Sequence, residues 1–325
     1  MGYKVYEAYK GFILDYNDKE LIKFMTDEVS KFLKSKKALK LIIDPYIPNV
    51  SRDTDANIVE GIDNRWVDEY LKSLGYQYNE DGAQVKWVYC LDIDGKDDKE
   101  VFNGFKNNTR NYINKTINKF KLNVRTLTKE QLSEFKQITS DTCDRRSFAD
   151  KSLKYYENMY DCFGDKVTFK ICELNCDMYI EVLEEEIKEY TRKVEELSDS
   201  SSNKKKKEEM RKNIENNKKK IEETKKLKEE KGSVLPLSAA MFMLYGDEIV
   251  YLFSGSYAEY MSFCGQYRLQ WEIIKYAAEN GYKRYNFYGI QDVFNPQGKD
   301  YGVYEFKKGF GGYVEELLGS FILDI

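Results

Sequence analysis

The chain has 325 residues, a formal net charge of −4 at pH 7 and no histidine. The length allows two domains and an insertion, because single hydrophobic cores rarely grow beyond about 250–300 residues. The lack of histidine excludes imidazole-based triads, HExxH metalloproteases and most zinc sites, and we predict no metal site. Because the net charge is negative, binding to nucleic acid or to an anionic membrane would have to use local basic patches.

The cysteines and the N-terminal residues bear on the compartment. Six cysteines occur without a CxxC pair, a pattern typical of reduced thiols rather than of a disulfide framework. The opening MGYKVYEAYK has no apolar stretch of signal-peptide length, and no apolar run reaches the roughly 18–20 residues of a membrane span. The sequence therefore predicts a cytoplasmic protein.

The first part of the chain predicts a helix over residues 17–36, capped by Asn17, and then a buried strand. The strand covers the apolar run in residues 40–45 and is closed by Asp44 and Pro45. A carboxylate at the end of a buried strand is a usual position for a functional group, although Asp before Pro also starts turns. Asp44 is therefore a candidate functional carboxylate, and the turn-starting role remains open beside it.

Helical and strand periodicities alternate from residue 64 to residue 163. Helices are predicted over 64–74, 102–119, 128–140 and 153–163, and strands over 84–92 and 124–127. Between the last two helices, residues 141–148 depart from the helical period and contain Arg145 and Arg146. Paired arginines in a polar segment suit a bidentate grip on phosphate or carboxylate, while ion pairs with Asp141 or Asp144 are the alternative.

Residues 179–231 form a distinct unit with heptad periodicity. Apolar residues recur at steps of three and four in two halves, which the polar segment 198–203 separates. The first half is rich in Glu and the second in Lys, so the halves complement each other as an antiparallel coiled-coil hairpin. The second half also offers a basic edge to an RNA backbone, although pairing between the halves explains the charges by itself.

The C-terminal part combines strands, a helix and an unusual aromatic segment. Strands are predicted over 237–244 and 248–254, and a helix over 267–280. The aromatic segment, residues 281–312, predicts strands at 284–288 and 303–306 joined by a loop of turn-forming residues. Lys307 and Lys308 would then lie at a strand end, either as part of a site or simply solvated. Strand–helix alternation around a helical insertion indicates an α/β or α+β protein with two similar lobes.

With these elements placed, several motifs carry a resemblance to a known family. They are Ala8-Tyr9-Lys10-Gly11-Phe12, IDP at 43–45, Asn108-Thr109-Arg110-Asn111-Tyr112, Gln270-Trp271-Glu272, YNFYGI and DYGVYEFKKGFGG. The chain resembles the Fem family (FemABX) of peptidoglycan-bridge aminoacyltransferases, from about residue 6 to residue 319, and the last two motifs are the most specific. Where the family has APRGP, this chain has Lys10 in place of the arginine and Phe12 in place of the proline.

The resemblance implies a fold of two acetyltransferase-like (GNAT) domains with an antiparallel coiled-coil helical arm inserted in the second. The first domain would be residues 1–122, the second residues 123–178 with 232–325, and the arm residues 179–231. The chain begins where the family's first domain is already under way, so we expect this domain to be truncated at its N-terminus.

The same resemblance implies an activity. A Fem-like enzyme transfers an amino acid from aminoacyl-tRNA to the stem-peptide side-chain amine of a peptidoglycan precursor, lipid II or its UDP-linked form, in interpeptide bridge synthesis. The resemblance links this chain to cell-wall biogenesis and cell shape. It implies no cofactor, since aminoacyl-tRNA is the donor substrate. Further expected partners are the inner membrane face, in peripheral contact, and related Fem proteins.

The resemblance also implies the site residues. Attack by an amine on an aminoacyl ester needs a deprotonated amine and a cation near the developing oxyanion. Asp44 would orient the amine or accept its proton, Lys307 would supply the cation, and Arg145 would grip the precursor phosphates. By position, the catalytic residues are Lys307, Phe306 and Asp44, and the substrate-binding residues are Arg145, Arg146, Tyr267, Lys10 and Tyr301.

Two other functions stay open on the sequence. A coenzyme-A-dependent N-acyltransferase would share the fold, but such enzymes cradle pyrophosphate with a Gln/Arg-x-x-Gly-x-Gly loop. Here Phe306 stands at the first position of that pattern, before Gly309 and Gly311. A non-catalytic RNA-binding or adaptor protein would also account for a coiled-coil arm.

Overall fold

The structure is a computed structural model that describes residues 4–198 and 200–325. Asp199, which the sequence places in the loop of the predicted hairpin, lies outside the described residues. The chain folds into two units, one of Met1–Asp92 with Arg284–Ile325 and the other of Ile93–Lys283. The boundaries of two repeated domains, as the sequence predicts them, stay a prediction.

The first unit combines strands from both ends of the chain. Its elements are β1 (Lys4–Ala8), α1 (Lys19–Ser35), β2 (Ala38–Ile43), β3 (Pro48–Arg52), β4 (Ile58–Asp63), α2 (Arg65–Ser73), β5 (Gln77–Asn79), β6 (Trp87–Asp92), β11 (Arg284–Gly289), α10 (Tyr301–Lys308), β12 (Tyr313–Leu317) and β13 (Ser320–Asp324).

One sheet of this unit has the order β1-β2-β13-β5 and confirms a strand before Asp44. β2 is internal, since it pairs parallel with β1 and antiparallel with β13. Ile43 of β2 lies in a core with residues of α1, α2 and β13. The N-cap of α1 is Asp18 rather than the predicted Asn17, because the Asp18 side chain accepts a hydrogen bond from the Leu21 N–H at 3.0 Å.

The other strands of the first unit follow the order β4-β3-β12-β6-β11, each antiparallel to the next. β12 lies against β6 directly after α10, through the pair Gly311-Gly312. Gly312 has φ +127°, and a Cβ there would lie 2.2 Å from the carbonyl oxygen of Cys90. Glycine is therefore required for the turn that joins α10 to β12.

The second unit contains an antiparallel sheet with helices on both faces. Its helices and strands are α3 (Asp98–Asn103), α4 (Asn107–Asn118), β7 (Asn123–Thr126), α5 (Leu132–Arg146), α6 (Leu153–Phe163), β8 (Val167–Asn175), α7 (Cys176–Glu196), α8 (Ser201–Lys231), β9 (Val234–Tyr245), β10 (Glu248–Ser256) and α9 (Gly265–Glu279).

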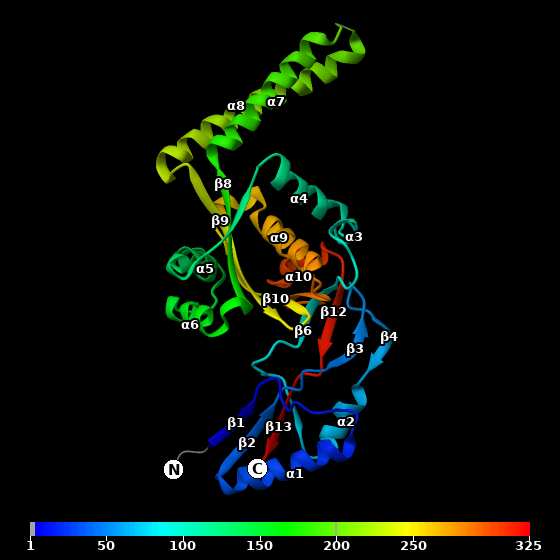
Figure 1. Ribbon diagram of the computed structural model, residues 1–325. Helices are drawn as coiled ribbons and strands as arrows, with labels where there is room; N and C mark the ends of the chain where they lie inside the picture. The colour runs from blue at the N-terminus through cyan, green and yellow to red at the C-terminus, as the bar shows by residue number, and fades with distance from the viewer. Residues whose placement is uncertain (1–3, 199) are drawn as a thin grey trace. The chain divides into compact units, whose positions relative to one another are not determined.

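In this unit the strands follow the order β10-β9-β8-β7. α9 covers one face of the sheet, and α5 and α6 cover the other (Figure 1). The core between the sheet and the helices α5 and α6 contains three rings that pack edge to face: Phe135 of α5, Tyr156 of α6 and Phe169 of β8. The mixed α/β class predicted from the sequence is thus confirmed. Within the described residues, no helix is long and apolar enough to cross a membrane.

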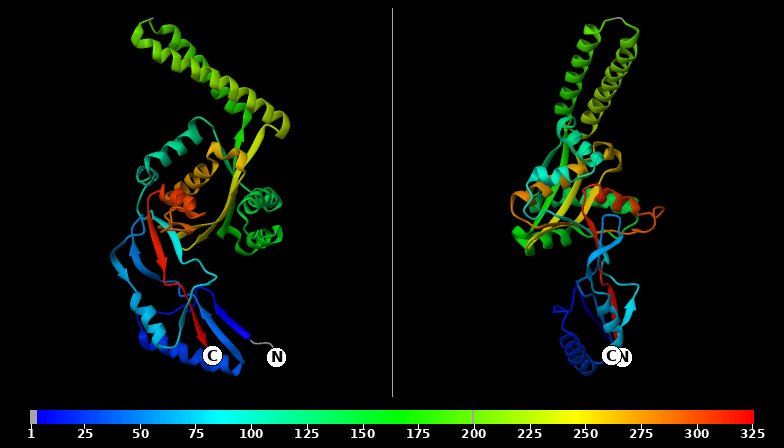
Figure 2. Two further views of the ribbon diagram at one scale, coloured as in Figure 1. Left: turned by 180° about the vertical axis from the view of Figure 1, so that it is seen from behind. Right: turned by 90° about the vertical axis from the view of Figure 1, so that its right-hand side faces the viewer.

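α7 and α8 form a helical hairpin between β8 and β9 (Figures 1 and 2). Near its base, the Asn217 side chain donates a hydrogen bond of 2.8 Å to the Glu186 carboxylate. Lys119, the residue after α4, donates to both oxygens of the same carboxylate, at 2.8 and 2.7 Å. The two predicted helices are confirmed, with the first beginning at Cys176, while coiled-coil packing between them stays a prediction.

Three segments differ from the sequence predictions. The helix predicted over residues 102–119 is interrupted, because α3 ends at Asn103 and α4 begins only at Asn107. Residues 303–306, predicted as a strand, belong to helix α10. Four alternating residues are too few to separate a period of 2 from one of 3.6, and the chain buries Tyr304 and Lys307 on one helical face. The predicted departure from the helical period at residue 141 is also wrong, because α5 continues through Arg146 and ends at Ser147, which has φ +60°. A last helical turn at the protein surface needs no apolar periodicity.

Candidate functional site

Lys307 of α10 is a buried amine. Its side chain donates hydrogen bonds from Nζ to the carbonyl oxygens of Gly289, at 2.6 Å, and Tyr288, at 3.3 Å. The residue is only 4% exposed, and burial lowers the pKa of Lys307 to about 7, because the ammonium group loses its hydration. The alternative of a solvated strand end is therefore wrong: Lys307 lies in the last turn of a helix and changes its charge near neutral pH.

The two carbonyl groups come from the end of β11. The register of β11 against β6 shifts between Asn286 and Gly289. Tyr288 has a left-handed backbone with φ +62°, and its N–H donates a 2.7 Å hydrogen bond to Oδ1 of Asn286. Sequence reasoning missed these groups, since main-chain carbonyls carry no residue signature. The available signal was Asn286, because an asparagine side chain often stabilises a turn by accepting a hydrogen bond from the backbone two residues later.

Lys308 is in a different environment from its neighbour. Its Nζ lies 2.6 Å from an oxygen of Asp55 and 3.0 Å from one of Glu305. Burial by itself would lower the pKa of Lys308, but the hydrogen bonds to Asp55 and Glu305 outweigh it and raise the pKa. Of the two adjacent lysines, Lys307 is thus the one whose charge responds to pH near 7.

Aromatic rings line the α10 segment. Phe306 packs edge to face on the buried Phe310, with ring centroids 5.4 Å apart, and Phe310 contacts Phe287 of β11 at 5.2 Å. Tyr301 packs on Tyr304 at 5.7 Å, and the Tyr304 hydroxyl donates to the carbonyl oxygen of Thr54 at 2.7 Å. These contacts fix the helix that carries Lys307 and surround it with apolar surface.

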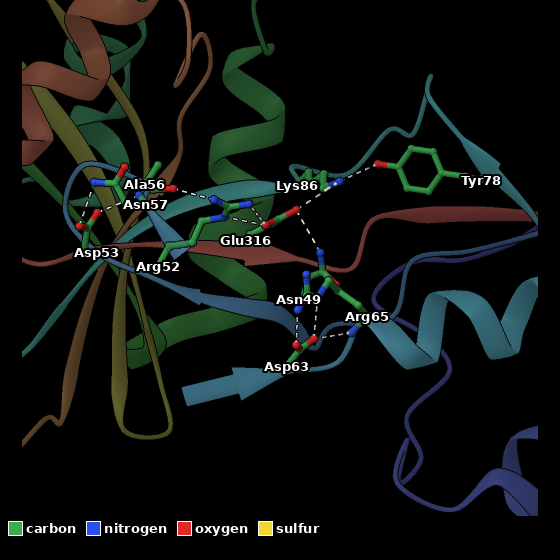
Figure 3. A network of polar contacts seen from close by, with 10 residues as sticks. All are labelled: Asn49, Arg52, Asp53, Ala56, Asn57, Asp63, Arg65, Tyr78, Lys86 and Glu316. Atoms are coloured by element: carbon green, nitrogen blue, oxygen red, sulfur yellow. Dashed lines mark hydrogen bonds and ion pairs between the residues drawn. The ribbon is translucent and has the colours of Figure 1, made fainter. Parts of the chain in front are cut away.

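A buried carboxylate, Glu316, fixes the strand that follows α10 (Figure 3). Arg52 of β3 donates to it from Nε, and its Nη2 lies 2.7 Å from the same carboxylate. Asn49 donates at 3.1 Å, and Lys86 Nζ lies at 3.5 Å. Because a buried carboxylate is costly without such partners, the cluster binds β12 firmly to β3.

Asp44 lies directly after β2 and is 6% exposed. Burial raises the pKa of Asp44, while a hydrogen bond with Ser320 and the positive charge of Lys10 act to lower it. Lys10 Nζ also lies 4.1 Å from the ring centroid of Tyr46. The structure thus brings two sequence-predicted site residues, Lys10 and Asp44, within electrostatic reach of each other.

Three of the predicted substrate contacts, Arg145, Arg146 and Tyr267, lie in the second unit, whereas Tyr301 lies in the first. Arg145 donates from Nη2 to the carbonyl oxygen of Ser256 at 3.0 Å, and Arg146 follows it in the last turn of α5. Tyr267 of α9 packs on Tyr112 of α4 with ring centroids 4.9 Å apart, and burial raises the pKa of Tyr267 to about 12. The roles of these residues in substrate binding stay predictions.

Comparisons with known proteins identify the family. Residues 1–325 match the FemAB family. The chain is 34% identical over 336 residues to aminoacyltransferase FemA of Staphylococcus epidermidis, which covers 99% of this chain and 80% of the relative. It is 32% identical, with the same coverage, to aminoacyltransferase FemA of Staphylococcus aureus. A crystal structure of FemX has the same fold, with a TM-score of 0.72 and 24% identity over 100% of this chain and 82% of that chain. The chain therefore belongs to the FemAB family.

Proposed function

We propose that this chain is an aminoacyltransferase that moves an amino acid from aminoacyl-tRNA to the stem-peptide side-chain amine of a peptidoglycan precursor. The proposal is supported by FemA relatives that carry the name aminoacyltransferase and cover 99% of the chain. The structural observation behind it is the buried Lys307, with its Nζ 2.6 Å from the Gly289 carbonyl oxygen.

The reaction needs little more than positioning and one cation. The acceptor nitrogen attacks the ester carbonyl carbon, a C–N bond forms, and the carbonyl oxygen becomes negatively charged. Collapse of this intermediate breaks the C–O bond to the tRNA ribose, so that an amide and a free ribose hydroxyl result, with the amine proton passing to the departing oxygen. Protonated Lys307 stabilises the oxyanion, and its burial strengthens that interaction by lowering the local dielectric constant.

Asp44 is assigned to the acceptor amine. A free lysine-type amine with a pKa near 10.4 is almost wholly protonated at pH 7, so a neighbouring carboxylate that accepts a proton or orients the nitrogen promotes attack. Asp44 is buried and lies after an internal strand, which gives it the rigid support that this task requires.

The glycines that follow Lys308 do not form the pyrophosphate loop of a coenzyme-A-dependent enzyme. Gly309 caps the C-terminal end of α10. That end of a helix carries a partial negative charge, whereas pyrophosphate binds at the positive N-terminal end. A glycine loop in this position therefore lacks the helix N-terminus that holds the pyrophosphate of a coenzyme.

Transfer assays with two donors test the proposal. The protein is mixed with a pool of charged tRNAs and either the UDP-linked or the lipid-linked precursor, and separately with acetyl-CoA and the same acceptors. Mass spectrometry should find an acceptor that is heavier by one aminoacyl group in the reaction with charged tRNA, and an unchanged acceptor in the reaction with acetyl-CoA. An acetylated acceptor would support the coenzyme-A enzyme instead, and tRNA binding without any product would support the adaptor.

A further inference from the structure

Asn286 is a buried amide beside the candidate catalytic lysine. It lies on β11 opposite Cys90 of β6 and is 1% exposed. Its Oδ1 accepts a hydrogen bond of 2.7 Å from the Tyr288 N–H, two residues ahead. An asparagine side chain in this arrangement mimics a main-chain turn and fixes the conformation of the residues that follow it.

Tyr288 needs such support. Its φ of +62° lies in the left-handed region, which residues with a Cβ rarely adopt and which bulky ones adopt only when the surroundings impose it. The hydrogen bond from its N–H to Asn286 supplies this constraint from within the same strand end.

The turn has a direct effect on Lys307. In a regular strand, successive carbonyl groups point to opposite sides, so one amine does not reach two of them. Here the carbonyl oxygens of Tyr288 and Gly289 are consecutive, and both accept from Lys307 Nζ, at 3.3 and 2.6 Å. The left-handed backbone of Tyr288, the last residue of β11 before Gly289, is what allows this arrangement.

We propose that Asn286 is a positioning residue: by holding Tyr288 in the left-handed conformation, it aims two successive carbonyl groups at Lys307 Nζ. The importance of this for transfer rests on the proposed function, in which Lys307 is the catalytic cation. The carbonyl dipoles favour the ammonium form. Cys90 of β6 is a titratable neighbour, and its negative charge would also raise the pKa of Lys307.

The test follows the ionisation of Lys307 itself. The full-length chain is labelled with 15N-lysine, the Lys307 Nζ signal is assigned by its loss in Lys307→Met, and its NMR shift is titrated with pH. In Asn286→Ala the carbonyl groups are no longer held, so the midpoint should fall by about one pH unit. Adding Tyr288→Gly should restore it, since glycine adopts positive φ without strain.

A control separates this role from the loss of any buried polar contact. Thr26→Val on α1 removes a buried hydroxyl that donates to the Ile22 carbonyl oxygen at 2.8 Å, and it should leave the Lys307 midpoint unchanged. An unchanged midpoint in Asn286→Ala, a rise in the midpoint, or a failure of Tyr288→Gly to restore it would each overturn the inference.

One further variant and one parallel assay keep the result decisive. If Asn286→Ala does not fold, Asn286→Leu keeps most of the side-chain volume without an acceptor, and the same fall and the same recovery with Tyr288→Gly are expected. Turnover of Lys307→Met is measured in parallel. Full activity of Lys307→Met would refute the proposed role of Lys307, whereas the titrations would still decide whether Asn286 positions the carbonyl groups.

Discussion

Lys307 Nζ donates a 2.6 Å hydrogen bond to the carbonyl oxygen of Gly289, which lies 18 residues earlier in the chain. A carbonyl group is a dipole and offsets only part of the hydration that a buried ammonium group loses. This is why the pKa of Lys307 falls to about 7, while the pKa of the adjacent Lys308, paired with Asp55 and Glu305, is raised. The contrast between the two lysines supports several tests.

Lys307→Met is expected to lower turnover by about 10²–10³-fold, because removing one group that stabilises an oxyanion typically has an effect of this size. Lys308→Met should have a much milder effect, since it removes ion pairs with exposed carboxylates. Single-turnover transfer rates at saturating acceptor compare the two variants. Equal rates would show that the charge of Lys307 takes no part in the chemistry.

The stability of the fold should rise with pH above about 7. Because burial lowers the pKa of Lys307 from its ordinary 10.5 to about 7, the unfolded chain binds this proton more tightly than the folded chain between these values. The free energy of unfolding should therefore rise by up to about 1.4 kcal/mol per pH unit from pH 7 to pH 10. Urea unfolding of the wild type and of Lys307→Met gives the difference, and a slope that persists in Lys307→Met would assign it to other groups.

Asp44→Asn is expected to reduce turnover by about 10²-fold at saturating acceptor, because the amide cannot accept the amine proton. It should not lower the melting temperature, since burial raises the pKa of Asp44 and so disfavours its charge in the folded state. Asp324→Asn, which removes an exposed carboxylate near Lys40, serves as the matched control. If Asp44 only starts a turn, Asn would replace it without loss of activity.

Arg145→Lys keeps the positive charge but loses the planar fork that grips a phosphate with two hydrogen bonds. We expect binding of the UDP-linked precursor to weaken by about tenfold while tRNA affinity stays unchanged. Isothermal titration with each ligand measures both, and Arg146→Lys in the same helical turn is the control. A loss of precursor affinity in Arg146→Lys alone would move the role to that neighbour.

Shortening the hairpin should separate tRNA binding from folding. Replacing residues 190–213 with a short Gly-Ser linker keeps the base, including Leu183, Glu186 and Asn217. The melting temperature should stay near that of the wild type, and tRNA affinity should fall, with the larger loss at low salt. A second variant tests the charge alone by changing four lysines together to Gln: Lys204, Lys205, Lys206 and Lys207. An unchanged tRNA affinity in both variants would contradict the role and favour a partner protein for the hairpin.

Local patterns in the sequence were sufficient for many elements and for the family. The helix at residues 153–163 and the strands of the 237–254 hairpin follow from apolar spacing and turn residues, and the structure places them there. The strand before Asp44 is also confirmed, because an apolar run closed by Asp-Pro is a local signal. The motifs of residues 281–312 indicated the FemAB family, which the comparisons establish.

Only the tertiary structure decided what kind of group Lys307 is. Four alternating residues gave an incorrect strand, and α10 forms a helix because Tyr304 and Lys307 are buried together against elements distant in the chain. The burial, the carbonyl partners and the lowered pKa of Lys307 all depend on β11 folding back with a left-handed residue at Tyr288. A residue's own sequence neighbourhood does not carry that information, since desolvation is set by whatever long-range packing excludes water around it.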